Sequence, residues 1–240
     1  MKKILFGLSL LMASDVYADT CIPKPNCADM GYTKTSCSGA YLKCPFDTSK
    51  MACLADAPLT GCYVGYIYYS DKTCSNNVIS GKTPIGVVVK ENAVVLSQMR
   101  SSLVTWGSRY TDVSGVVDTT SDTALLDYNG KSNTAAIVAA CSSDTTSNNA
   151  AKYCNSYSTT GTSVGQWYLP AAGELFSYVY GNYSTITTTA SKLGWTYSSG
   201  YYWSSSERGD SYAWSVHTYD GNVASDYKGY GKSVSCFLEI

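Results

Sequence analysis

The sequence predicts a mixed α+β fold in which strands come first, helices follow and strands return at the end. Three patterns favour this order. Apolar β-branched runs occur between residues 83 and 96, helix start and stop signals lie between residues 132 and 194, and polar and apolar residues alternate from residue 212 onward. We therefore expect two groups of strands separated in the chain by short helices.

The first 18 residues are expected to be a secretory signal peptide. Lysines precede an apolar run at residues 4–12, and Val16 and Ala18 occupy the positions that a signal peptidase reads. The apolar run is far shorter than the ~20 residues that a spanning helix needs. The mature chain is therefore expected to be secreted, on the cell surface or in the periplasm, with no integral membrane segment.

Cysteines set the next boundary. The chain has 10 cysteines, all after the expected cleavage point, which indicates disulfides in an oxidising compartment. Residues 19–60 form a Cys-rich N-terminal segment with few aliphatic side chains, so cross-links must hold it. Zinc is an alternative there, but no histidine is near and no C-x-x-C pair repeats. The cysteines before Tyr63 are Cys21, Cys27, Cys37, Cys44, Cys53 and Cys62.

Residues 61–240 are expected to form the second and larger domain. Its first strands are expected at residues 61–69, 83–90, 93–96 and 103–106. Residues 70–72 read as a turn, and Glu91 and Asn92 join the second and third strands. Residues 109–128 have no clear period and several Asp, Ser and Thr side chains, which indicates a loop.

Four helices are expected after this loop. They are residues 135–140, 150–157, 170–181 and 186–193. Ser132 or Asn133 can cap the first, and Gly181 and Gly194 are stop signals for the last two. Cys141 and Cys154 flank a polar loop, so a disulfide between them is attractive. Sequence alone does not fix the pairing of these two with Cys74 and Cys236.

Strands return at the C-terminus. Residues 201–204 are a candidate core strand, and Asp220-Gly221 is a two-residue hairpin turn that places Tyr219 opposite Asn222. The strand before the turn is expected to expose Ser215, His217 and Tyr219 and to bury Trp214, Val216 and Thr218. Residues 233–240 supply a last strand, with Val234, Cys236 and Leu238 on one side.

Several motifs together resemble a known fold family. They are residues 167–175 (WYLPAAGEL), residues 202–207 (YWSSSE), Ala213-Trp214, residues 220–223 (DGNV) and residues 236–238 (CFL). In this order they resemble the C-type-lectin-fold domains of bacterial surface proteins, in particular the formylglycine-generating-enzyme-like branch. The resemblance covers roughly residues 61–240. It implies a C-type-lectin-like fold of mixed antiparallel sheets with two or three short helices.

The C-terminus is further similar to variable proteins that retroelements diversify. In those proteins Tyr, Ser, Asp, Gly, Arg and His are scattered over exposed positions of a fixed scaffold, which suits binding because tyrosine gives contact area at low entropy cost. The resemblance implies a scaffold of Trp203, Ala213, Trp214, Val216, Gly221, Val223, Val234 and Cys236. The ligand-binding residues that we expect are Arg208, Asp210, Ser211, Tyr212, Ser215, His217, Tyr219, Asp226, Tyr227 and Tyr230.

Charge and missing motifs exclude several functions. The net charge is -1 without a Lys/Arg cluster, so nucleic acid and anionic membrane are not expected partners. A hydrolytic triad is not expected. His217 is the only histidine, and the strand face that carries it holds Ser and Tyr without an orienting acid. The sequence also has no G-x-S-x-G elbow. Cys236 is the sole cysteine after Cys154, which does not support the oxidase chemistry of sulfatase-modifying relatives.

No cofactor is expected, although calcium stays open. Sugar-binding lectins that use calcium carry a Glu-Pro-Asn or Gln-Pro-Asp loop, and neither occurs here. Four loop aspartates could gather around a cation, yet dispersed acidic residues are usually solvated and no ligand spacing is visible. These are Asp112, Asp118, Asp122 and Asp127.

The sequence thus favours a non-catalytic, exported binding protein of the adhesin or receptor type. Its expected partner is a macromolecular or glycan ligand on another cell or on a phage. Two alternatives stay open: a structural subunit or tip of a bacterial surface appendage, and an oxidase related to the formylglycine-generating enzyme.

Overall fold

The computed structural model describes residues 35, 41–43, 49–53, 61–100, 102–107, 109–141 and 149–240. The chain divides into two compact units, Met1–Thr60 and Gly61–Ile240. In the first unit β1 (Tyr41–Lys43) pairs antiparallel with β2 (Met51–Cys53). The expected signal peptide and most of the Cys-rich segment lie outside the described residues.

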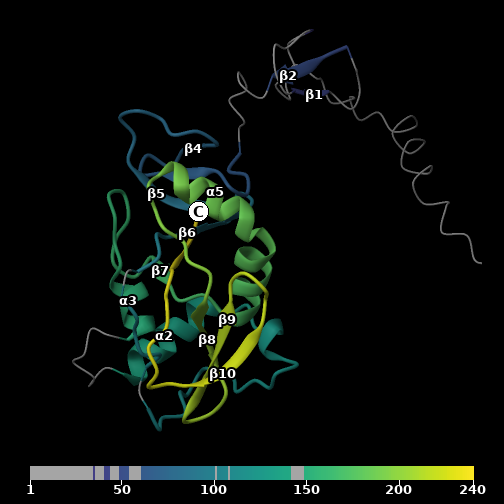
Figure 1. The fold of residues 1–240 in the computed structure, drawn as a ribbon. Helices are drawn as coiled ribbons and strands as arrows, with labels where there is room; N and C mark the ends of the chain where they lie inside the picture. Colours follow the sequence, from purple (N-terminus) through teal and green to yellow (C-terminus); the bar gives the residue numbers. More distant parts are fainter. Residues whose placement is uncertain are drawn as a thin grey trace, which may run out of the picture. The chain divides into compact units, whose positions relative to one another are not determined.

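The larger sheet described in the second unit has six antiparallel strands. Its strands, in spatial order, are β4 (Cys74–Ser75), β3 (Ile67–Tyr69), β5 (Pro84–Lys90), β6 (Val94–Leu96), β11 (Phe237–Glu239) and β7 (Trp167–Tyr168). Strands β4 and β5 lie near α5 (Tyr183–Lys192) (Figure 1). β5 and β6 pair through the expected turn, in which Asn92 has φ 49°. β11, the last strand in the sequence, therefore lies in the same sheet as β3 to β6, the first strands of this unit.

Both faces of this sheet are buried. Val87 and Val88 are adjacent in β5, and neither is exposed to solvent. Val87 packs with Ile186 and Trp214 in one apolar cluster, whereas Val88 packs with Ile137 in a second one. This explains why β5 is an almost unbroken apolar run, since a strand covered on both faces has no polar side.

The second sheet has three antiparallel strands. They are β8 (Tyr201–Glu207), β9 (Tyr212–His217) and β10 (Val223–Tyr227), with β9 in the middle. In Figure 1 these strands lie at one end of the second unit, and α5 (Tyr183–Lys192) lies with β4 and β5 at the other. Trp203 and Trp214 anchor this sheet in the two apolar clusters.

The remaining helical segments lie between β6 and β8 in the sequence, on either side of β7. They are η1 (Ala124–Leu126), α2 (Gly130–Ala140), α3 (Ala150–Ser156), α4 (Ala172–Glu174), the π-helical η2 (Leu175–Val179) and the 3-10 helix η3 (Tyr180–Asn182). α2 begins five residues before the expected start because Asp127 accepts hydrogen bonds from Asn129 N (2.9 Å) and Asn133 Nδ2 (2.9 Å). Gly181 does not end the helical run, since α5 follows η3 directly.

The motif at residues 167–175 is structural. Glu174 accepts a hydrogen bond from Ala171 N (2.7 Å), and a Cβ on Gly173 would lie 2.6 Å from the carbonyl oxygen of Asp127. The serines of β8 are likewise buried: Ser206 Oγ donates to Asp127 Oδ2 (2.6 Å). Small residues at these positions let the chain between η1 and α4 pack tightly against β8.

Two disulfides cross-link the second unit. They join Cys62 to Cys74 and Cys154 to Cys236. The expected Cys141–Cys154 bridge is wrong, because the C-terminal strand brings the Cα of Cys236 to 5.3 Å from that of Cys154. In the described part of the chain, none of the helices is long and apolar enough to cross a membrane.

Candidate functional site

The hairpin of β9 and β10 carries most of the expected site residues. Its register pairs Tyr212 with Tyr227 and Val216 with Val223. The expected two-residue turn is wrong: His217 N donates to Asn222 O (2.8 Å) and Gly221 N donates to His217 O (2.9 Å), which leaves a four-residue loop. Gly221 (φ 76°) allows this loop, because a Cβ there would lie 2.7 Å from the Tyr180 ring.

The two faces of β9 are both covered in the middle of the strand. Trp214, Val216 and Thr218 are buried as expected. Ser215, however, was expected to be exposed and is fully buried, with its Oγ donating to Asp226 Oδ2 (2.6 Å). The expected exposure is wrong because Trp203 of β8 lies beside Ser215 on the same face of the sheet.

Four tyrosines gather at the end of the hairpin away from its loop. We call Tyr110, Tyr212, Tyr227 and Tyr230 the tyrosine cluster. Tyr227 is central, with ring centroids 6.0 Å from Tyr110, 6.2 Å from Tyr212 and 5.6 Å from Tyr230. The outer three rings are 72%, 48% and 61% exposed, respectively. An exposed aromatic group of this size is typical of a contact surface.

Tyr110 was not among the expected site residues. It lies in the segment between β6 and η1, 117 positions from Tyr227, and its hydroxyl is 2.7 Å from the Tyr227 hydroxyl. Its φ of 58° is a left-handed conformation that bulky side chains rarely adopt. No pattern in the sequence indicates this neighbour, because only the tertiary fold brings the loop to the hairpin.

A buried ion pair supports the tyrosine cluster from below. Lys228 follows Tyr227 directly and is fully buried, with its Nζ bonded to Glu207 Oε1 and to the carbonyl oxygen of Thr111 (2.7 Å). Glu207 also accepts from Val113 N (3.1 Å). These bonds hold both ends of residues 111–113 and so fix the loop that presents Tyr110.

The electrostatics of this region follow from burial and proximity. Burial raises the pKa of Glu207, while the hydrogen bond from Lys228 opposes that rise. The hydrogen bond with Tyr110 raises the pKa of Tyr227. Tyr227 therefore keeps its hydroxyl proton at neutral pH.

The expected site residues at the loop end of the hairpin form a separate group. The Tyr201 ring lies tilted against His217 (centroids 4.9 Å apart), and Tyr219 packs edge-on against Tyr183 of α5 (5.7 Å). His217 and Tyr212 lie at opposite ends of β9, roughly 17 Å apart at the rise of an antiparallel strand. The expected residues are thus divided between two ends of the hairpin.

His217 does have an acidic neighbour, contrary to expectation. Its Nδ1 lies 2.7 Å from Asp220 Oδ1, across the four-residue loop. The pKa of Asp220 is lowered, first by the hydrogen bond from Asn222 N and then by His217. The Asp220 carboxylate therefore contacts both His217 and Asn222, and these contacts stabilise the loop end of the hairpin.

The remaining expected residues lie beside the tyrosine cluster. Arg208 and Asp210 are exposed, and the guanidinium carbon of Arg208 is 5.5 Å from the Trp214 ring. Ser211 is half-buried, and its carbonyl oxygen accepts from Lys228 N (3.0 Å). Asp226 forms an ion pair with Lys232 (2.9 Å). Of these residues, Arg208 and Asp210 are the accessible ones.

Three carboxylates approach one another below the cluster. Ligand oxygens of Asp112, Asp118 and Glu207 lie within 4.8 Å of one another. Glu207 is already neutralised by Lys228, which opposes a cation at this position. Asp127 is not part of this group of carboxylates, because its own carboxylate accepts hydrogen bonds from Asn133 of α2 and from Ser206. The expected loop aspartates therefore do not converge as one set.

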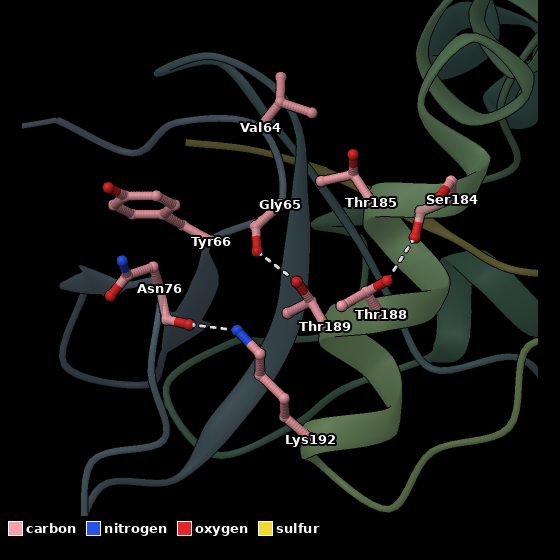
Figure 2. Close-up of a pocket in the computed structure, with 9 residues that line it drawn as sticks. All are labelled: Val64, Gly65, Tyr66, Asn76, Ser184, Thr185, Thr188, Thr189 and Lys192. Carbon is pink, nitrogen blue, oxygen red and sulfur yellow. Dashed lines mark hydrogen bonds between the residues drawn. The ribbon is translucent and has the colours of Figure 1, made fainter. Parts of the chain in front are cut away.

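A pocket of about 330 Å³ lies between α5 and the start of β3 (Figure 2). Figure 2 shows how its polar groups are used: Thr189 Oγ1 donates to Gly65 O (2.6 Å), and Lys192 Nζ donates to Asn76 O (2.8 Å). Thr188 Oγ1 bonds to Ser184 O within the helix (2.8 Å). The polar side chains here join α5 to the sheet.

Comparison with known proteins gives one structural likeness to report. No family model matches the chain, and no curated protein matches it. A fimbrial protein from Bacteroides ovatus, solved as a crystal structure, is similar with a TM-score of 0.60 and 19% sequence identity. The likeness covers 74% of this chain and 49% of that protein, so the chain spans about half the length of its structural neighbour. At this identity the likeness concerns the fold.

Proposed function

We propose that this chain is a non-catalytic binding protein of a bacterial surface, and that the tyrosine cluster contacts a macromolecular or glycan ligand. The observation that carries this proposal is the position of Tyr227. Its ring lies within 6.2 Å of three other tyrosine rings, each of them largely exposed. Aromatic side chains of this kind contribute a large share of binding energy at interfaces.

The support beneath the cluster favours recognition with little rearrangement. Lys228 and Glu207 are fully buried and tie the Tyr110 loop to the sheet. A surface that is already fixed loses less conformational entropy when a ligand binds. We infer that the cluster is pre-organised, with exposed Arg208 and Asp210 at its edge as adaptable polar contacts.

We also propose the finer family assignment, a C-type-lectin-like fold whose C-terminal positions a retroelement diversifies. Antiparallel sheets with few helices and the buried residues of the YWSSSE motif support it. The expected variable positions Tyr212 and Tyr230 are exposed, and the expected scaffold residues Trp203 and Trp214 are buried. Sequencing the gene neighbourhood tests this: a reverse transcriptase with a near-copy of the 3′ coding region, differing at adenines, is expected.

The binding function is tested with a triple variant, Tyr212→Ala, Tyr227→Ala and Tyr230→Ala, in the mature chain. Labelled protein is measured against a panel of intact bacterial cells and immobilised bacterial glycans. The triple variant should lose binding to every probe that the unaltered chain binds. Tyr63→Ala, which truncates a 36% exposed tyrosine outside the cluster, is the matched control and should bind normally. Unchanged binding by the triple variant would contradict the proposal.

A second candidate is a structural subunit or tip of a surface appendage. The likeness to a fimbrial protein favours it, and the two disulfides fit an extracellular setting. The tyrosine cluster would then contact a neighbouring subunit. Sedimentation at rising protein concentration separates the candidates, because a subunit should associate and the triple variant should stay monomeric.

We propose no catalytic role for the C-terminal cysteine. Cys236 and Cys154 are bonded to each other and fully buried, which fits a structural cross-link better than the reactive thiol that an oxidase needs. Alkylation of the native protein followed by peptide mapping checks this. Cys236 should stay unlabelled until the protein is unfolded and reduced, and rapid labelling would favour the oxidase.

A further inference from the structure

A second hollow lies on the same face of the hairpin as the tyrosine cluster. It has a volume of about 440 Å³, within the range of roughly 300–1,000 Å³ that small-molecule sites occupy. Its lining residues are Thr119, Thr120, Ser121, Arg208, Trp214 and Ser225. Trp214 is two residues from Tyr212 on β9, and Ser225 is two residues from Tyr227 on β10, so side-chain alternation puts the pocket beside the cluster.

Two lining side chains hold polar atoms that lack a partner. Trp214 is 97% buried, since its exposed fraction is 3%, and its Nε1 has no hydrogen-bond acceptor. The buried Oγ of Ser225, its neighbour in the β9–β10 register, has no partner either. Buried polar groups are nearly always hydrogen-bonded, so these two adjacent groups are available to a ligand that enters the pocket.

Arg208 lies over the Trp214 ring and lines the same pocket. Its guanidinium carbon is 5.5 Å from the Trp214 ring, and the side chain is exposed. Among the described residues no carboxylate pairs with this guanidinium, and no carboxylate lines the pocket. Arg208 can therefore change rotamer without breaking an ion pair and is available to an anion that enters.

The pocket in Figure 2 provides the contrast. There the side-chain hydroxyl of Thr189 and the ammonium of Lys192 are both engaged with backbone carbonyl groups. A ligand in that pocket would compete with bonds that the fold already uses. In the pocket beside the tyrosine cluster, a ligand would instead complete the bonding of Trp214 and Ser225.

We infer that the pocket of Arg208, Trp214 and Ser225 binds an acidic sugar residue of a glycan. The indole N–H can only donate, and a guanidinium binds a carboxylate through two parallel hydrogen bonds. The unpartnered Ser225 hydroxyl can bond to a hydroxyl group of a sugar ring, whereas the Thr119 and Thr120 hydroxyls already bond to Glu207 O and Thr123 Oγ1 and keep a lone pair that can accept. The tyrosine cluster then contacts the rest of the glycan, so this inference rests on the proposed binding function and specifies its ligand class.

The experiment uses the mature chain and defined probes. Glucuronic acid and sialyllactose are titrated by calorimetry, with glucose and lactose as neutral matches and a glutamate-rich peptide as an acidic non-sugar. The acidic sugars should bind, and ¹⁵N-resolved NMR should show a shift of the Trp214 indole N–H. Trp214→Phe removes the donor and keeps an aromatic ring, and Arg208→Gln removes the charge. Each should lower affinity roughly tenfold or more.

Thr188→Ala, in the pocket of Figure 2, is the matched control and should leave binding unchanged. Circular dichroism and the melting temperature show whether Trp214→Phe folds, and Ser225→Ala supplies a milder variant of the same pocket. Equal affinity for neutral sugars, or binding of the peptide but not of the sugars, would overturn the inference. If the tyrosine triple variant loses cell binding while the pocket variants keep it, the proposed function stands and the acidic-sugar site fails.

Discussion

The hydroxyl oxygens of Tyr110 and Tyr227 lie 2.7 Å apart although 117 positions separate them in the chain. This contact joins the last hairpin to a loop that precedes the helices in the sequence. Because Lys228 Nζ bonds to Thr111 O, one residue after Tyr110, the two segments are tied both at the surface and beneath it. The exposed tyrosine cluster is therefore a product of two distant segments.

Tyr227→Phe should separate the role of the hydroxyl from that of the ring. The variant loses the bond to Tyr110 but keeps the aromatic contacts, so binding to cells or glycans should weaken only several-fold. Tyr227→Ala should weaken it more than tenfold, since hot-spot aromatic rings contribute about 2 kcal/mol or more. Binding curves for the two variants, measured side by side, check the order. Equal losses would assign the effect to the hydroxyl.

Tyr110→Gly should stabilise the fold slightly while weakening binding. A left-handed φ costs a bulky residue about 1 kcal/mol, and glycine removes that strain. The ring is 72% exposed, so little packing is lost. Urea unfolding should show an unchanged or higher free energy of unfolding, by up to about 1 kcal/mol. Lys72→Gly, at φ 65°, gives the same backbone change away from the cluster and should leave binding intact.

Lys228→Met should be strongly destabilising because it leaves the Glu207 carboxylate buried without its cation. Removing one member of a buried ion pair costs about 3–5 kcal/mol. The double variant Lys228→Met and Glu207→Leu removes both charges and should recover part of that loss. Chemical unfolding of the single and double variants measures the coupling. A single variant as stable as the unaltered chain would show that the pair does not support the cluster.

Stability should fall as the pH rises from about 4.5 to about 7, because burial raises the pKa of Glu174 to about 7. The folded state then holds a proton that the unfolded state releases near pH 4.5. The contribution of Glu174 is complete below pH 4.5 and is lost progressively up to about pH 7, by at most about 3 kcal/mol in total. Urea unfolding from pH 4.5 to 8 measures it. Glu174→Gln should flatten this part of the profile.

Replacing Cys154 and Cys236 by Ala should lower the free energy of unfolding by about 2–5 kcal/mol, as expected for a disulfide that closes a long loop. This bridge spans 82 positions and ties α3 to the segment before β11. The Cys62–Cys74 bridge spans only 12 positions, so its removal should cost less in the chain-entropy view. Thermal unfolding of the two double variants tests the ranking.

Local patterns predicted the parts of the fold that depend on neighbours in sequence. The turn at Asn92, the pairing of residues 84–90 with 94–96 and the helix at residues 150–156 follow the expected positions. The alternation of residues 234–238 also predicted that Val234, Cys236 and Leu238 share one side, and all three lie in the same apolar cluster. These features depend on turn chemistry and on periodicity, which a strand or helix carries within itself.

Errors arose where distant segments meet. The start of α2 depends on Asp127 and its bonds to Asn133, and the pairing of Cys154 depends on the C-terminal strand. The predicted exposure of Ser215 was wrong because alternation only separates the two faces of a strand. It does not show whether a neighbouring strand covers the second face.

By itself, the sequence determined the α+β class, the order of strands and helices, and the concentration of tyrosine and serine at the C-terminus. Only the tertiary structure decided which of those residues share a surface. It brought Tyr110 to Tyr227, buried Ser215 and left Trp214 Nε1 unpartnered beside Arg208. The physical reason is that composition and periodicity act within one segment, whereas a binding surface depends on register, burial and ion pairs between segments.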